Sequence, residues 1–123
     1  MIEIDLKNDL ESSMGMNAYP IKIPQNAAYP AIVYKEISNG RNDDSNLDSS
    51  NLRNKYYEIV IVTPDSELVI TKKNELIEKY EGFSGTMGET NIFISRIESS
   101  VPSFDNAQQN FEYNITIKFT ENI

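Results

Sequence analysis

The segment FEYNITIKFT, Phe111–Thr120, decides the fold class, because its apolar and polar side chains alternate without a break. Successive side chains of a β-strand point to opposite faces of the sheet. The period of two therefore predicts a half-buried strand with one apolar face and one wet face. The apolar face comprises Phe111, Tyr113, Ile115, Ile117 and Phe119. We expect a long antiparallel strand here.

Four further segments have strand character. NKYYEIVIVT, Asn54–Thr63, is β-branched and aromatic on both faces, which predicts a more central strand covered on both sides. AIVYKEI, Ala31–Ile37, predicts a shorter strand, and NIFISRIE, Asn91–Glu98, another. YPIKIP, Tyr19–Pro24, is extended, but its two prolines confine it to an edge or an arm.

One helix is well marked by its ends. Asp65 follows Pro64 and suits an N-cap, while Gly82 suits the C-terminal end. Apolar residues recur between them at helical spacing: Val69, Leu76, Ile77 and Tyr80. The following run GFSGTMG, 82–88, is predicted to be a flexible turn into the next strand, because it leaves a helix and so does not match a phosphate-binding loop.

The N-terminal segment allows two interpretations. Leu6, Leu10 and Met14 step by four with Asp5 as a cap, which predicts a short helix that ends at Gly15. A step of two from Ile2 would instead indicate a strand. We favour the helix, because Ser-Ser-Met-Gly suits a helix end better than a continuing strand.

Together these segments predict a single α+β domain over residues 1–123. Its sheet is mainly antiparallel, with about four to five strands, two helices on one face and a long loop between two strands. Neither side of that loop is long enough to bury a core alone, so we expect no second domain.

The long loop is SNGRNDDSNLDSSNLRN, Ser38–Asn54, and it has only two apolar side chains. So polar a segment cannot bury enough surface to offset its ordering entropy, which predicts flexibility. Long loops inside compact domains are usually functional or disordered, and in a protein with no visible chemistry we expect such a loop to bind a partner. The candidate contact residues follow from position in the loop, not from a motif: Arg41, Asp43, Asp44, Leu47, Asp48, Leu52 and Arg53. Tyr19 and Tyr29, beside prolines, are either interface anchors or core residues.

Composition argues against several functions. The chain has 11 basic and 19 acidic side chains, a net charge of −8, which disfavours specific binding to DNA or anionic lipid. It has no histidine and no cysteine, the usual general base, metal ligands and nucleophile, so we expect no enzyme and no cofactor. Its N-terminus, MIEIDLKNDLE, is acidic, unlike a signal peptide. No stretch approaches the roughly 20 apolar residues of a membrane span.

A metal site is also not expected. Asp44 to Asp48 imitates the opening of a calcium loop, which needs Gly at its sixth position and Glu at its twelfth. Those positions hold Ser49 and Lys55.

The run IPQNAAYPAIVYKEIS, Ile23–Ser38, resembles a segment of tail terminator (tail completion) proteins of tailed bacteriophages, in which a strand follows a stretch rich in proline and aromatic residues. The order of elements that follows is also similar, from roughly Leu6 to Phe119. The resemblance implies an α+β subunit that forms a ring, typically of six copies, on the end of the tail tube. Such a ring stops tube polymerisation and offers a surface for head attachment.

The resemblance further implies the partners: other copies of this chain, the tail tube protein and a head completion or connector protein. DNA would pass through the ring without specific binding, which suits an acidic channel. The protein would be assembled in the host bacterial cytoplasm and end in the neck of the virion. Two other hypotheses stay open. One is another neck component, such as a head–tail joining protein or a tube subunit; the other is a small bacterial adaptor that binds a peptide along a strand edge.

Overall fold

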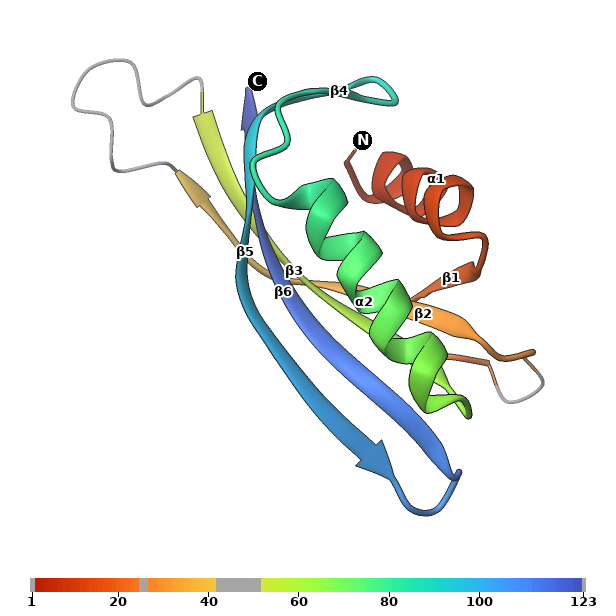
Figure 1. Cartoon of the computed structure of the whole chain (residues 1–123). Helices are drawn as coiled ribbons and strands as arrows, with labels where there is room; N and C mark the ends of the chain where they lie inside the picture. The colour runs from red at the N-terminus through yellow and green to blue at the C-terminus, as the bar shows by residue number, and fades with distance from the viewer. Residues whose placement is uncertain (1, 25–26, 42–51, 123) are drawn as a thin grey trace.

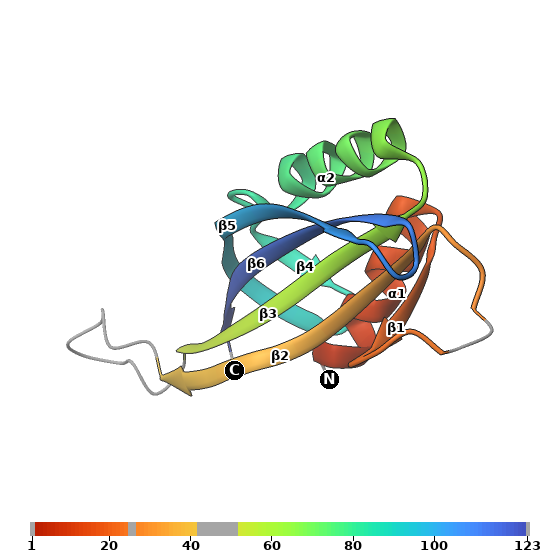
Figure 2. The ribbon, with the colours of Figure 1, turned by 90° about the horizontal axis from the view of Figure 1, so that it is seen from below.

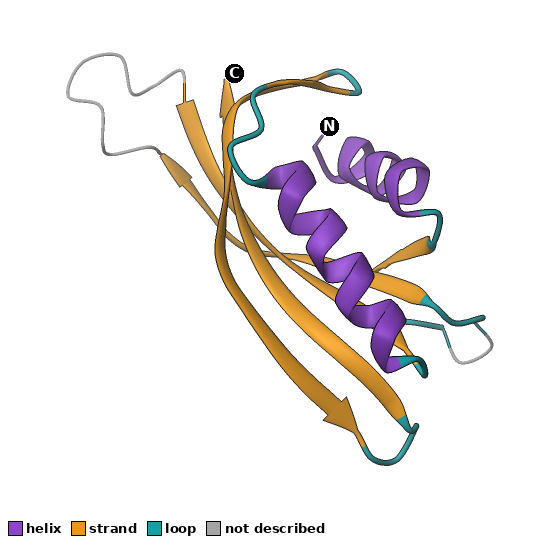
Figure 3. Cartoon of the chain, viewed as in Figure 1, coloured by secondary structure: helices purple, strands orange, loops and turns teal. Residues whose placement is uncertain are grey.

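The structure is a computed structural model that describes residues 2–24, 27–41 and 52–122, the side chains of 39–41 excepted. It is an α+β fold in which a mixed sheet curls around two helices as a half-barrel (Figure 1). The elements are α1 (Ile2–Met14), β1 (Asn17–Pro20), β2 (Ala31–Arg41), β3 (Leu52–Thr63), α2 (Ser66–Tyr80), β4 (Gly85–Met87), β5 (Thr90–Asp105) and β6 (Asn110–Asn122). Both helices lie on the same side of the sheet (Figure 3).

The sheet has six strands in the order β1-β2-β3-β6-β5-β4. The α+β class and the mainly antiparallel pairing confirm the prediction, but the strand number and one pairing differ from it. β1 pairs with β2 in parallel, and β4 has only three residues. Both are too short for a recognisable alternation, and β4 lies in the glycine-rich run 82–88, which is therefore not only a turn.

The two strands at the centre of the sheet are β3 and β6. They pair over their full lengths, from Leu52↔Asn122 to Thr63↔Phe111. On β6 the predicted alternation is confirmed, because Ile115, Ile117 and Phe119 are fully buried. β3 is central as predicted, but the helices cover one face only. Several side chains of its other face stay half-buried, among them Tyr56, Glu58 and Val60.

Irregularities in the ladder help the sheet to bend, as Figure 2 shows for β5 and β6. The register shifts between Glu36 and Ser38 on β2, and twice on β5, between Ile92 and Ile94 and between Ile97 and Ser99. An extra residue in one strand bends it and increases its twist. β5 also runs seven residues past the predicted end at Glu98, through Pro102 to Asp105.

Both predicted helices form. The N-terminal segment is helical as favoured, although it begins at Ile2, before the expected cap. Its buried residues recur on one face, Ile2, Leu6, Leu10 and Met14. α2 begins where predicted, because the Asp65 carboxylate accepts hydrogen bonds from the backbone N–H groups of Glu67 and Leu68 at 2.9 and 3.2 Å.

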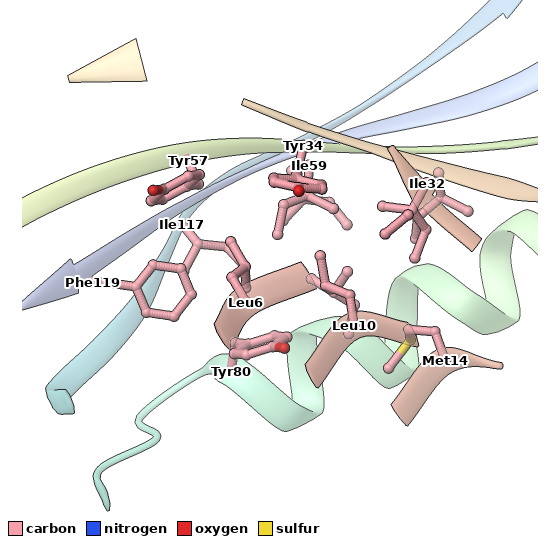
Figure 4. Close-up of a cluster of buried hydrophobic side chains, with 14 of the residues drawn as sticks. Leu6, Leu10, Met14, Ile32, Tyr34, Tyr57, Ile59, Tyr80, Ile117 and Phe119 are labelled. Atoms are coloured by element: carbon pink, nitrogen blue, oxygen red, sulfur yellow. The ribbon is translucent and has the colours of Figure 1, made fainter. Parts of the chain in front are cut away.

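The core fills the space between the helices and the sheet (Figure 4). Leu6 and Leu10 of α1 are fully buried, as is Leu76 of α2. Phe119 of β6 contacts two tyrosine rings edge-on, with centroid distances of 6.0 Å to Tyr57 and 5.8 Å to Tyr80. Such edge contacts between aromatic rings add to the stabilisation from burial.

The predicted loop at 38–54 is shorter in the structure at both ends. β2 continues through Arg41, and β3 begins at Leu52, with Arg41 paired to Arg53. The polar side chains hid this extension, which is held by backbone pairing: β3 is flanked here by β6 as well as by β2, with Leu52 paired to Asn122 and Arg53 to both Arg41 and Glu121. Residues 42–51 lie outside the described residues, so their predicted flexibility stays a prediction.

Candidate interaction surfaces

The predicted contact residues fall into two groups. Arg41 ends β2, and Leu52 and Arg53 begin β3, where both are half-buried and pair with Asn122 and Glu121 of β6. These three are therefore strand residues, contrary to the expectation of a loop. The remaining four lie in 42–51, outside the described residues: Asp43, Asp44, Leu47 and Asp48.

The two candidate interface tyrosines differ in exposure. Tyr19 lies on β1 opposite Val33 and is half-buried. Tyr29, just before β2, is 39% exposed. Only Tyr29 therefore offers much of its surface to a partner.

The buried polar groups have structural partners. The Tyr57 hydroxyl donates a hydrogen bond to Glu36 Oε2 at 3.3 Å, and the Tyr80 hydroxyl donates to Asp9 Oδ2. Burial, followed in size by the neighbouring carboxylates, raises the pKa of both phenols well above the ordinary value. Both tyrosines therefore stay neutral and join elements of the core. Within the described residues, no three acidic side chains gather as a metal site would require.

Asp5 of α1 holds the turn between β4 and β5. Its carboxylate accepts hydrogen bonds from the Thr90 hydroxyl and from the Glu89 backbone N–H. The Thr90 hydrogen bond is the main cause that lowers the pKa of Asp5. Gly88 of this turn has φ of +61° and lies directly against the same carboxylate.

One edge of the sheet is open. β1 covers β2 only from Ala31 to Tyr34, and the backbone of Ile21 adds one hydrogen bond to the Tyr34 carbonyl at 2.9 Å. From Lys35 onward no described strand lies beyond β2. Ile37 on this stretch is 48% exposed. Unpaired backbone groups along such an edge can bind another extended segment.

The opposite side of the sheet is partly covered, because β4 pairs with β5 at Thr90–Ile92 and other groups bond to β5 further along. Its Ser95 exchanges backbone hydrogen bonds of 2.8 Å with Gly82 and Phe83, and the Ile97 N–H donates to the Glu81 carboxylate at 2.9 Å. Outward-facing backbone groups alternate along an antiparallel strand. The register with β6 therefore turns the backbone of Pro102 outward too, where proline has no N–H to offer.

An apolar groove lies between the first half of α2 and the hairpin of β5 and β6, and we call it the hairpin groove. It has a volume of about 260 Å³. Its lining residues are Ser66, Val69, Ile70, Pro102, Ser103, Phe111, Glu112 and Tyr113. Ile70 is 48% exposed. Phe104 of β5 is 42% exposed, and its ring lies 4.9 Å from that of the lining residue Phe111.

A protruding turn, Ile21–Lys22, follows β1, and we call it the knob. Ile21 is 74% exposed, the most exposed of the large apolar side chains described. The Lys22 N–H donates to the Pro20 carbonyl at 2.7 Å around an Ile21 φ of +69°, as in a γ-turn with positive φ. A β-branched residue is strained in this conformation.

Sequence reasoning missed both surfaces. The groove could have been suspected from Phe104 and Phe111, which flank the polar turn DNAQQN, 105–110. The knob has no sequence signal, because isoleucine does not mark turns.

No helix within the described residues is long and apolar enough to span a membrane. No protein-family model matches the chain, and no curated protein shows significant similarity to it.

Proposed function

We propose that this protein is a non-enzymatic assembly subunit of a tailed-phage virion, a tail terminator that forms a ring on the tail tube and stops its growth. The observation that carries the proposal is the resemblance of Ile23–Ser38 to tail terminators. In the structure this run leads into β2 and forms most of it. The absence of histidine and cysteine from the sequence supports the non-enzymatic part.

The surfaces on the two sides of the sheet support ring formation. The knob and the open edge of β2 lie at one end of the strand order, while the hairpin groove lies beside β5 and β6. These surfaces differ in shape and chemistry. Closed rings are built when unlike surfaces of neighbouring copies meet head to tail and the rotation closes.

The test is the size of the assembly. Purified protein would be studied by light scattering and electron microscopy over a range of concentrations, alone and with the tail tube protein of the same phage. A terminator should give closed rings, and its addition should stop tube growth at a fixed length. Tubes that lengthen from this chain alone would identify a tube subunit, and tube growth unaffected by the protein would refute the terminator role.

The partner-binding role of the 38–54 segment has its own test. Since Arg41 pairs with Arg53, replacing residues 42–52 by Asn-Gly would join the two strands by a two-residue turn. Loop shortening has a small effect on chain entropy, so we expect the variant to fold. It should form rings but bind tube ends more weakly, and full binding would show that the segment has no such role.

The open edge of β2 favours one alternative, the peptide-binding adaptor. Such an adaptor would add an extended peptide beside Lys35–Arg41 through backbone hydrogen bonds. It would stay monomeric at all concentrations and show no effect on tubes. Backbone amide shifts confined to β2 on peptide addition would support this alternative.

A further inference from the structure

We infer that the knob of one copy inserts into the hairpin groove of the next copy, so that Ile21 contacts Ile70 across a head-to-tail interface. The inference rests on the proposed ring, and it names the surfaces that join its subunits. The occupant of the groove would be a second copy of this chain.

The apolar part of the fit comes from exposure and volume. Ile21 leaves most of its side chain in water at the tip of a tight turn, and the groove opens beside the half-exposed Ile70. The groove volume of about 260 Å³ exceeds the roughly 150 Å³ of an engineered apolar cavity that holds benzene. One aliphatic side chain can therefore enter it. Insertion would remove both isoleucines from water together.

The charges around the two surfaces are complementary. Lys22 follows Ile21, is exposed, and has no ion pair within the described residues. Glu67 lies one turn before Ile70 on α2, is equally exposed, and has no ion pair in the same part of the chain. In the proposed contact, the ammonium group of Lys22 pairs with this carboxylate. A rim charge pair of this kind mainly sets orientation and partner choice.

The edge of β5 also favours a contact through side chains. The backbone of Ser95 is already bonded to Gly82 and Phe83, that of Ile97 to Glu81, and Pro102 has no N–H, so strand pairing is disfavoured on the β5 side. A contact through side chains is favoured there instead. The knob and the groove are two different surfaces of the same copy. One copy can therefore use both at once, and the contact can repeat around a ring.

Cysteine crosslinking tests the pairing directly, since the chain has no cysteine of its own. Ile21→Cys and Ile70→Cys variants would be mixed and oxidised. We expect a disulfide-linked dimer in the mixture and little from either variant alone. The matched control is Ile4→Cys mixed with Ile70→Cys, because Ile4 is a 56% exposed isoleucine of α1 outside both surfaces. Crosslinking no faster than in the control overturns the inference.

Sedimentation provides the second arm. Ile21→Asn keeps a residue that tolerates positive φ but removes the apolar tip, and Ile70→Lys blocks the groove. Each should weaken self-association roughly 10- to 100-fold, while Ile4→Asn should leave it unchanged. Mixed in equal amounts, the two variants retain one intact knob and one intact groove between them, so they should form a dimer that grows no further.

The two failures are distinguishable. The knob-and-groove contact is overturned if the Ile21→Asn and Ile70→Lys variants associate as strongly as the wild type. It is also overturned if the wild type does not associate at the highest concentration. If the protein still caps tubes in that case, the terminator role stands and the ring closes through other surfaces.

Discussion

The turn between β4 and β5 allows a sharp prediction for Gly88→Ala. Gly88 has φ of +61°, and an added Cβ would lie 2.3 Å from Asp5 Oδ1. Real Cβ atoms do not approach an oxygen so closely, so the Asp5 side chain must move. That movement breaks the hydrogen bonds that Asp5 accepts from Thr90 and Glu89.

A second glycine separates the two costs. Gly82 has a similar φ of +74°, but a Cβ there meets no atom within 4 Å. Gly82→Ala therefore measures the backbone cost alone, about 1–2 kcal/mol. Gly88→Ala adds the lost hydrogen bonds to a partly exposed carboxylate, about 1–2 kcal/mol more. The total of about 2–4 kcal/mol would lower the melting temperature by about 3–5 °C per kcal/mol.

The assay is urea unfolding of each variant, followed by circular dichroism. In an Asp5→Ala background the carboxylate is gone and only the Cβ of residue 5, 3.1 Å away, remains close, so Gly88→Ala should cost little more than Gly82→Ala. The reasoning fails if Gly88→Ala is no more destabilising than Gly82→Ala in the wild-type background. It fails equally if the extra cost persists without Asp5.

Three further predictions concern the core and the titrating groups. Leu6→Ala should destabilise the protein by about 2–5 kcal/mol in urea unfolding, because Leu6 is fully buried between α1 and the sheet. The pKa of Asp5 is held below its ordinary 3.8 by the Thr90 hydroxyl, so its stabilisation is present above that pH and lost as pH falls through the lowered value. Asp5→Asn should therefore be less stable at pH 7 and lose less stability on acidification; parallel curves would contradict this. Tyr57 and Tyr80 should ionise only when the protein unfolds in alkali. In an alkaline titration, the tyrosinate absorbance should therefore stay below the value for all seven tyrosines as long as the circular dichroism is native.

The periodic elements were the predictable part of the fold. Strict alternation identified β6, and the Asp65 cap identified the start of α2. The helix at α1 was favoured over a strand because Ser-Ser-Met-Gly suits a helix end, and the step of four through Leu6, Leu10 and Met14 then marked its buried face. In the two periodic elements, β6 and α1, side chains that face the core recur at a fixed spacing, so one exceptional residue does not hide the pattern.

The short and irregular parts could not be predicted. β1 and β4 are held by neighbouring strands, and their own side chains carry little signal. The end of β5 was hidden by Pro102, which normally argues against a strand but is tolerated where the backbone faces outward. The candidate surfaces depend on which elements meet in space. Pro102 and Phe111, for example, line the hairpin groove together with Ile70, although they are more than 30 residues away from it in the sequence.

The partial cover of the β5 edge has a consequence for what happens when many copies are made at once. A sheet that can be extended on one side only gives pairs, whereas a sheet that can be extended on both sides gives fibres without end. Here β2 has an open edge from Lys35 onward, whereas β5 is covered at Ser95 and Ile97 and lacks an N–H at Pro102, so sheet extension on the β5 side is disfavoured. Replacing Pro102 by a residue with an N–H would weaken that safeguard, and insoluble aggregates on overexpression would be the first sign of it.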